Sequence, residues 1–276
     1  MSWNIYKKKI AEGKTKIIYQ SSKNPTEVRI KSKDAITAQN GARREVIPGK
    51  GRLVNSIACE QFDILGRHNV PSAFRCRCDE VSFIATRCEM VKLEIVVRFE
   101  IDAAGSYKKR NPNVPDGQRL KEPLVELFLK TSQRKWGLRD LPCDDPLIRE
   151  AQYGRYEVYQ PDIPLRDQMP LFEITTDETG LRKESDMAVL HHLARAAGAA
   201  FYDAWASVGV RLIDFKMEVG YTPDGELVFA DLMSPDECRM VTDISKQGFR
   251  TGDAPEVVYA KYVLADALLR EVCSVL

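Results

Sequence analysis

The segment LIDFKMEVG at 212–220 contains the side chains best suited to chemistry. Successive side chains of a β-strand point to opposite faces, so Asp214, Lys216 and Glu218 share one face and the apolar residues between them share the other. The turn sequence TPDG follows and predicts a hairpin whose second strand ends at Asp231, opposite Glu218. Two converging carboxylates suit Mg²⁺, and the lysine between them can neutralise a carboxylate or phosphoryl group. A solvated strand face with an ion pair explains the segment equally well.

Three basic turns offer places for a phosphate group. The first, EGKTK at 12–16, precedes a strand and makes a workable phosphate cover, although the spacing of a P-loop is absent. The second, GKGR at 49–52, leads into a helix N-terminus, which favours an anion. In the third, Arg98 is followed by small residues, Ser106 and the basic cluster at 108–110, which together can wrap a phosphate monoester. An exposed basic turn or a solvated charge run is the alternative in each case.

Hydrophobic periodicity predicts the elements that position these residues. The predicted strands are 16–20, 28–33, 81–87, 90–99, 211–221 and 226–231. The predicted helices are 53–66, one that begins near 184 and ends at Gly209, and one that starts at Pro255. Strands dominate the first third of the chain, whereas helices and a hairpin dominate the end. This order predicts an α+β protein of two lobes with a cleft between them.

Two further expectations concern the strands before residue 100. The strands at 81–87 and 90–99 are expected to pair with each other. In the second of them Lys92, Glu94 and Arg98 share the polar face, which lines either solvent or a polar site, and exposure to solvent is favoured. Residues 105–183 are rich in turn formers, and the periodicity predicts no elements there.

Composition narrows the class of protein. The 276 residues include 41 Lys and Arg against 40 Asp and Glu, and this balance argues against a nucleic-acid or membrane-surface binder. The chain contains no apolar run of the roughly 18 residues that a membrane span needs. The chain start turns charged before an apolar targeting segment can form, and Cys76 and Cys78 lack zinc-site spacing. We therefore expect a cytoplasmic protein that binds small molecules.

The order of the motifs resembles one family over about 240 residues. The chain is similar to the SAICAR synthetases, the purine-pathway ligases, in eight ordered blocks. These blocks are EGKTKIIY at 12–19, KDAITAQNGARREVIPGKGRLVNSI at 33–57, EMVKLEIVVR at 89–98, AAGSYKKRNP at 103–112, DDPLI at 144–148, LIDFKMEVG at 212–220, ADLMSPDECR at 230–239 and KQGFR at 246–250. Eight blocks in the same order leave little room for coincidence.

The resemblance implies a fold and a reaction. The fold is two-lobed α+β, related to ATP-grasp and kinase-like folds, with antiparallel sheets and an ATP cleft between an N-terminal lobe, 1–91, and a C-terminal lobe, 92–276. The reaction is ATP-dependent amide formation between 5-amino-4-carboxyimidazole ribotide (CAIR) and L-aspartate, through an acyl phosphate. ATP is then a co-substrate and Mg²⁺ the metal, and a homo-oligomer is possible.

The resemblance also implies roles for individual residues. The ATP-phosphate loop is matched by Gly13, Lys14 and Lys16, and the adenine hinge by Glu89, Met90 and Val91. The magnesium carboxylates are matched by Glu218 and Asp231, and the catalytic positions by Asp214 and Lys216. The substrate-binding positions are matched by Glu94, Arg98, Ser106, Arg239, Lys246, Gln247 and Arg250. No residues of an aspartate pocket are assigned.

Departures from the family pattern leave alternatives open. Eight positions separate Arg98 from Ser106, two more than the family pattern, so the loop must bulge or the match must shift. Segments 131–143 and 155–184 are also longer than in compact members. One alternative is a paralogous ATP-dependent amide ligase that acts on a different carboxylated azole nucleotide or amine. The other is a nucleotide-binding protein without catalysis, against which the intact lysines and metal carboxylates argue.

Overall fold

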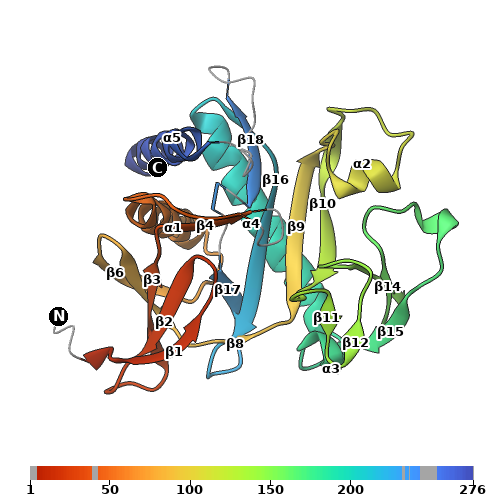
Figure 1. Ribbon diagram of the computed structural model, residues 1–276, viewed down its shortest axis with the longest axis horizontal. Coiled ribbons are helices and arrows are strands. Elements are labelled where there is room, and N and C mark those ends of the chain that lie inside the picture. The colour runs from red at the N-terminus through yellow and green to blue at the C-terminus, as the bar shows by residue number, and fades with distance from the viewer. Residues whose placement is uncertain (1–4, 39–42, 232–233, 236, 243–253, 276) are drawn as a thin grey trace.

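Two antiparallel β-sheets of unequal size form the framework of the protein (Figure 1). The computed structural model describes residues 5–38, 43–231, 234, 235, 237–242 and 254–275. The smaller sheet has the strand order β1-β2-β3-β7-β6. Its strands are β1 (Lys8–Glu12), β2 (Lys16–Gln20), β3 (Glu27–Ser32), β6 (Phe74–Asp79) and β7 (Ser82–Thr86). A separate hairpin, β4 (Ala35–Ala38) and β5 (Arg43–Val46), leads into the first helix.

The larger sheet has nine strands and contains the hairpin singled out in the sequence. Its main order is β15-β14-β13-β10-β9-β16-β17, and β8 and β18 also pair with β16. The strands are β8 (Glu89–Met90), β9 (Leu93–Glu100), β10 (Arg119–Leu129), β13 (Leu147–Gln152), β14 (Arg155–Tyr159), β15 (Phe172–Thr175), β16 (Val210–Tyr221), β17 (Leu227–Asp231) and β18 (Cys238–Thr242). Because β16 and β9 lie at the centre, their polar faces meet in the middle of the molecule.

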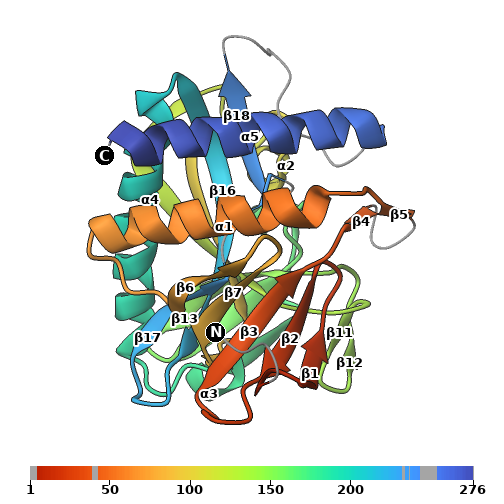
Figure 2. The same cartoon turned by 90° about the vertical axis from the view of Figure 1, so that its left-hand side faces the viewer.

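Three long helices cover the sheets. They are α1 (Lys50–Arg67), α4 (Asp186–Ser207) and α5 (Pro255–Val275), and they bury an apolar stripe that includes Ile57, Phe201 and Tyr262. The short elements are α2 (Ser106–Arg110), β11 (Lys135–Trp136), β12 (Arg139–Asp140), η3 (Leu165–Asp167) and α3 (Thr176–Thr179). Helix α4 packs on the large sheet, and α1 lies on the small sheet with α5 alongside (Figure 2). One continuous core therefore supports both sheets.

The pairing expected between 81–87 and 90–99 is wrong. Strand β7 pairs with β3 and β6, whereas β9 pairs with β10 and β16 in the other sheet. The short strand β8 lies between them in the chain and pairs with β16. The chain therefore passes from the small sheet to the large sheet between β7 and β8. Closeness in sequence suggested a hairpin, but each strand completes the sheet of its own lobe. The region without predicted elements, 105–183, supplies β10 to β15.

The predicted anion site at the N-terminus of α1 is also wrong, because the protein supplies its own anion. The Asp34 carboxylate accepts hydrogen bonds from the backbone N–H groups of Gly49, at 3.2 Å, and Gly51, at 2.7 Å. The Lys50 side chain is fully buried, with its ammonium 4.6 Å from the centre of the Tyr262 ring. A carboxylate at this helix end satisfies N–H groups that have no partner inside the helix. The basic turn therefore secures α1.

Replacing Asp34 with alanine is expected to lower the free energy of unfolding by about 1 kcal/mol, the usual cost of losing a helix cap. The measurement is chemical denaturation of the Asp34→Ala variant. Asp203→Ala, on the exposed side of α4, serves as the control and should change stability by less than about 0.5 kcal/mol. An equal change in the two variants would contradict the capping role.

Among the described residues, no helix is both long and apolar enough to cross a membrane.

Candidate active site

The centre of the large sheet presents a polar face built from β16 and β9. The register places Asp214 opposite Arg98 and Lys216 opposite Val96, so these positions share one face with Glu94. The alternate residues of β16 are buried with α4 on the other face, as the period-2 pattern predicted. Exposure of this polar face of β9 to solvent was the favoured expectation, and it is wrong for Arg98, which is 4% exposed.

The acidic end of this face is formed by Glu218 and Asp231, which lie opposite each other in the β16–β17 pairing. The Lys130 ammonium contacts Glu218, and the Lys16 ammonium, from the small sheet, contacts Asp231. Burial raises the pKa of Glu218, and Lys130 opposes this effect. In the described part of the chain no cluster of three or more metal-binding side chains occurs. A buried carboxylate, Glu218, and a partly exposed one, Asp231, still fit Mg²⁺, which uses one or two protein carboxylates and fills its other positions with water and phosphate oxygens.

Lys216 lies in the middle of the face and is held between carboxylates. Its ammonium is 2.9 Å from Glu94 Oε1 and 3.7 Å from Glu237 Oε1. Burial lowers the pKa of Lys216, but the charges of Glu237 and Glu94 outweigh burial, and the net shift is upward. Lys216 is therefore a fixed cation at neutral pH. It is suited to neutralising negative charge and not to acting as a base.

The basic end of the face joins Asp214 to two arginines. The Arg98 guanidinium contacts Asp214, and Arg239 Nη1 lies 2.9 Å from Asp214 Oδ2 and 3.1 Å from Asp102 Oδ2. Arg98 Nη2 also donates to Ser106 Oγ at 3.3 Å. Guanidinium groups combined with a hydroxyl make a suitable cradle for a phosphate monoester.

The extra residues between Arg98 and Ser106 are absorbed by a turn. The Gly105 N–H donates to the Asp102 carbonyl at 3.0 Å, and α2 then starts at Ser106. A Cβ atom at Gly105 would lie 2.9 Å from Arg239 Nη1, so glycine allows this arginine to approach. The loop thus bulges, and Ser106 still reaches Arg98.

A family profile described as SAICAR synthetase matches residues 9–258 of this chain. The chain belongs to the SAICAR synthetase family. Members are ATP-dependent ligases of purine biosynthesis, and this confirms the enzyme class predicted from the sequence.

Individual relatives agree with this assignment. The phosphoribosylaminoimidazole-succinocarboxamide synthase of Shouchella clausii is 34% identical over 238 residues, which cover 86% of this chain and 84% of the relative. The bifunctional purine synthesis protein purC/E of Dictyostelium discoideum is 31% identical over 231 residues, 84% of this chain but 20% of that protein. A solved structure described as SAICAR synthetase (Type-2) in complex with ADP has a TM-score of 0.73 and 25% identity, covering 94% of this chain and 96% of that one. The expected two-lobed α+β fold is confirmed.

The ATP-phosphate loop expected from the SAICAR synthetase pattern is the turn between β1 and β2. The Gly13 N–H donates to the Lys16 carbonyl at 2.9 Å, and Lys33 Nζ donates to the Gly13 carbonyl at 2.9 Å. The Lys14 side chain is exposed, whereas Lys16 reaches Asp231 in the large sheet. This turn therefore joins the small sheet to the predicted metal carboxylates.

The predicted adenine hinge of this SAICAR synthetase is the strand β8 and the residue after it. Met90 and Glu89 lie opposite Gly220 and Tyr221 of β16. The Val91 N–H donates to the Val219 carbonyl at 3.0 Å, so this N–H is not available to a nucleotide base. A Cβ atom at Gly220 would lie 2.9 Å from the Glu89 carbonyl oxygen, so only glycine permits this close approach.

Replacing Gly220 with alanine is expected to push β8 away from β16 and raise the KM for ATP several-fold. A displaced hinge removes ground-state binding of the nucleotide and leaves the lysines and carboxylates in place. Steady-state kinetics with varied ATP measure the effect, and Gly225→Ala in the turn of the same hairpin controls for general strain. An unchanged KM for ATP in Gly220→Ala would contradict the hinge assignment.

Three predicted substrate residues, Lys246, Gln247 and Arg250, fall outside the described residues. The basic cluster at 108–110 is described, and it stabilises its own loop. Lys108 donates to the carbonyls of Pro112, at 3.0 Å, and Val114, at 2.7 Å, and Lys109 pairs with Asp162. Both lysines therefore have partners within the protein, and the wrapping of a phosphate by this cluster stays a prediction.

Lys130 is a site residue that the sequence did not reveal. It follows β10 directly, and the next residue, Thr131, is fixed by Asp145. The Thr131 N–H donates to Asp145 Oδ1 at 3.0 Å, and the Asp145 N–H donates to Thr131 Oγ1 at 2.8 Å. The apolar run that ends at Lys130 was the available signal, but it lies in the region without predicted elements.

Proposed function

We propose that this protein joins the carboxylate of CAIR to the amine of L-aspartate at the expense of ATP, through an acyl phosphate. The observation that carries the proposal is the polar face shared by β16 and β9, with carboxylates at one end, a fixed lysine in the middle and a guanidinium cradle at the other. These two strands lie side by side in the large sheet (Figure 1). Membership of the SAICAR synthetase family and a relative described in complex with ADP support the same reaction.

The order of groups along this face supports the chemistry. An ionised carboxylate is a poor electrophile, and its conversion to an acyl phosphate creates a leaving group that an amine can displace. Phosphoryl transfer depends mainly on in-line positioning and on neutralising the charge spread over the phosphoryl oxygens. Lys216 supplies a fixed positive charge where the substrate carboxylate and the phosphoryl group would meet. Asp214 would orient the ribotide, and Glu94 would lie beside its imidazole.

The acidic end would hold the metal. Glu218 and Asp231 are the residues that would bind Mg²⁺, which supplies neutralisation of phosphate charge when bound. Their present partners, Lys130 and Lys16, already carry positive charge at the same place. Gly13 and Lys14 in the adjoining turn would face the ATP phosphates. Lys16 and Lys130 would remain beside the same phosphates.

The two lobes, with their boundary after residue 91, would contribute different parts of the active site. Residues 1–91 would contribute the phosphate loop and the hinge with Glu89, Met90 and Val91, and residues 92–276 the metal and ribotide sites. Arg98, Ser106 and Arg239 would hold the ribotide phosphate, and Lys246, Gln247 and Arg250 would lie near the reacting groups. The cytoplasmic location, the absence of a nucleic-acid partner and a homo-oligomeric state stay predictions.

ADP release tests the proposal. Purified protein is supplied with Mg-ATP while CAIR and L-aspartate are varied one at a time, and the product is identified by mass. ADP release that requires both substrates, with a succinocarboxamide product, is the expected result. Release that requires another azole nucleotide or another amine would indicate the paralogous ligase, and ATP binding without release would indicate the non-catalytic protein.

A further inference from the structure

We propose that Glu126 and Arg110 are positioning residues that hold the Arg98 guanidinium in the orientation required by the ribotide phosphate. The inference rests on the proposed role of Arg98 in binding that phosphate. Neither Glu126 nor Arg110 lies on the strand that carries the reacting groups. Glu126 comes from β10, and Arg110 comes from the end of α2.

The geometry assigns each nitrogen of Arg98 a separate partner. Nε donates to Glu126 Oε2 at 2.6 Å, Nη1 contacts Asp214, and Nη2 donates to Ser106 Oγ at 3.3 Å. A guanidinium is planar and rigid, so a carboxylate on the Nε edge fixes the plane in which the two Nη groups lie. Each Nη carries two N–H groups, and the contacts printed among the described residues use one of them on each nitrogen.

Glu126 is itself held by a second arginine. The Arg110 guanidinium contacts the other oxygen of the Glu126 carboxylate and also donates to the Pro161 carbonyl. Arg98, Glu126, Arg110 and Asp214 are all nearly inaccessible to solvent, at 4%, 9%, 5% and 4% exposure. Two buried guanidiniums so close together would repel each other without the carboxylate between them. Glu126 therefore compensates both guanidiniums, and it shares the charge of Arg98 with Asp214.

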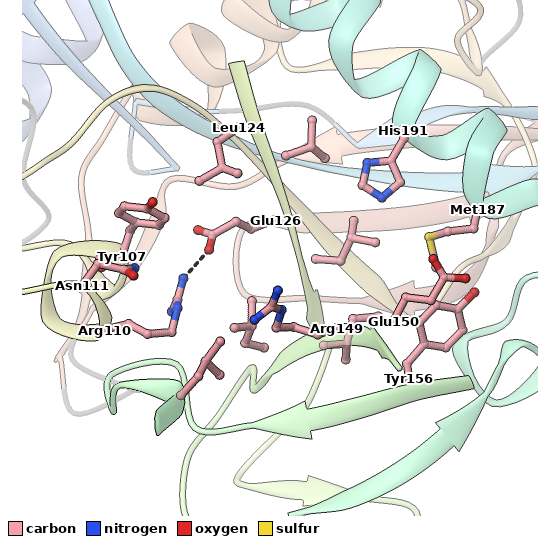
Figure 3. Close-up of a pocket in the computed structure, with 15 residues that line it drawn as sticks. Tyr107, Arg110, Asn111, Leu124, Glu126, Arg149, Glu150, Tyr156, Met187 and His191 are labelled. Atoms are coloured by element: carbon pink, nitrogen blue, oxygen red, sulfur yellow. Dashed lines mark hydrogen bonds and ion pairs between the residues drawn. The ribbon is translucent and has the colours of Figure 1, made fainter. Parts of the chain in front are cut away.

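One side of the Arg110–Glu126 ion pair borders a cavity. Strands β10 and β13 are paired only at Leu127 with Ile148 and Phe128 with Leu147. A cavity of about 500 Å³ borders these strands, and the Arg110–Glu126 pair lines it (Figure 3). Side chains with empty space on one side are not confined by contacts there, so their ion pairs must set their orientation.

The test compares substrate with and without its phosphate. Glu126→Gln keeps the shape of the side chain and removes its charge. We expect the KM for CAIR to rise about tenfold or more, the effect of losing a charge-assisted hydrogen bond, while kcat changes little. The riboside that lacks the 5′-phosphate should react equally with the variant and the wild type. The double variant Arg98→Met with Glu126→Gln should be no worse than Arg98→Met alone, because the two residues act as one unit.

The controls separate positioning from general stability. Glu60 is another buried glutamate, paired with Arg77 at 2.8 Å on the small-sheet side, and Glu60→Gln should leave the KM for CAIR unchanged. If Glu126→Gln does not fold, Arg110→Lys carries the test, and the same rise in KM for CAIR but not for the riboside is expected. A folded variant with an unchanged KM for CAIR, or an equal loss on both substrates, would overturn the inference. Failure of the wild type to use CAIR would instead refute the proposed function.

Discussion

Replacing Lys216 with methionine lowers kcat by at least about a hundredfold, the scale observed when one preorganised electrostatic group is removed from a site. The methionine keeps most of the apolar stem but leaves no cation between Glu94 and Glu237, which then repel the incoming phosphoryl group. Because the pKa of Lys216 is raised, the wild-type residue is charged throughout the neutral range and its loss is not masked by pH.

The measurement for Lys216→Met is steady-state ADP release with CAIR, L-aspartate and ATP each varied. Lys121→Met, an exposed lysine on β10, is the matched control and should retain wild-type kinetics. Thermal unfolding shows whether either variant has lost its fold. A raised KM with unchanged kcat would make Lys216 a binding residue and not a catalytic one.

Replacing Glu218 with alanine abolishes turnover, because one of the two carboxylates predicted to bind Mg²⁺ is removed. The fold is expected to survive, since the partner Lys130 has a side chain 46% exposed and can turn to water. Asp231 alone would then have to hold the metal beside the ATP phosphates. Loss of the Glu218 carboxylate also leaves less negative charge to balance Lys16 and Lys130. The excess positive charge disfavours the binding of a divalent cation between these lysines.

Activity of Glu218→Ala is measured over a wide range of Mg²⁺ concentration. Partial recovery at high Mg²⁺ would support the metal role, because excess metal compensates for weakened binding. Glu226→Ala, an exposed residue in the same hairpin, should titrate with Mg²⁺ as the wild type does. Near-wild-type activity of Glu218→Ala at low Mg²⁺ would show that the metal assignment is wrong.

Local sequence determined those features that depend on residues close together in the chain. The period-2 pattern of 212–220 placed Asp214, Lys216 and Glu218 on one face, and the hairpin turn set Glu218 opposite Asp231. The 3.6-residue periodicity identified the three long helices within a few residues. Ordered motifs identified the family, because motif spacing is a property of the chain itself.

Strand partners were not predictable in the same way. The strands at 81–87 and 90–99 are neighbours in sequence, but each pairs within a different sheet. Periodicity records which face of a strand is apolar, and not which other strand completes its hydrogen bonds. The strands between 105 and 183 were missed because turn-forming residues surround them and their stability comes from their neighbours in the sheet, and this holds even for β10 with its 11 residues.

Tertiary structure decided which charges lie together. Lys16 reaches Asp231 across 215 positions of sequence, Lys130 reaches Glu218 across 88, and Arg98 meets Glu126 on the adjacent strand. The sequence alone does not show whether a charged residue faces water or a buried partner. The burial of Arg98 follows from the strands and the loop that close over it, and the Asp34 cap follows from a hairpin that returns to α1. Long-range packing therefore turned separate charged residues into a site.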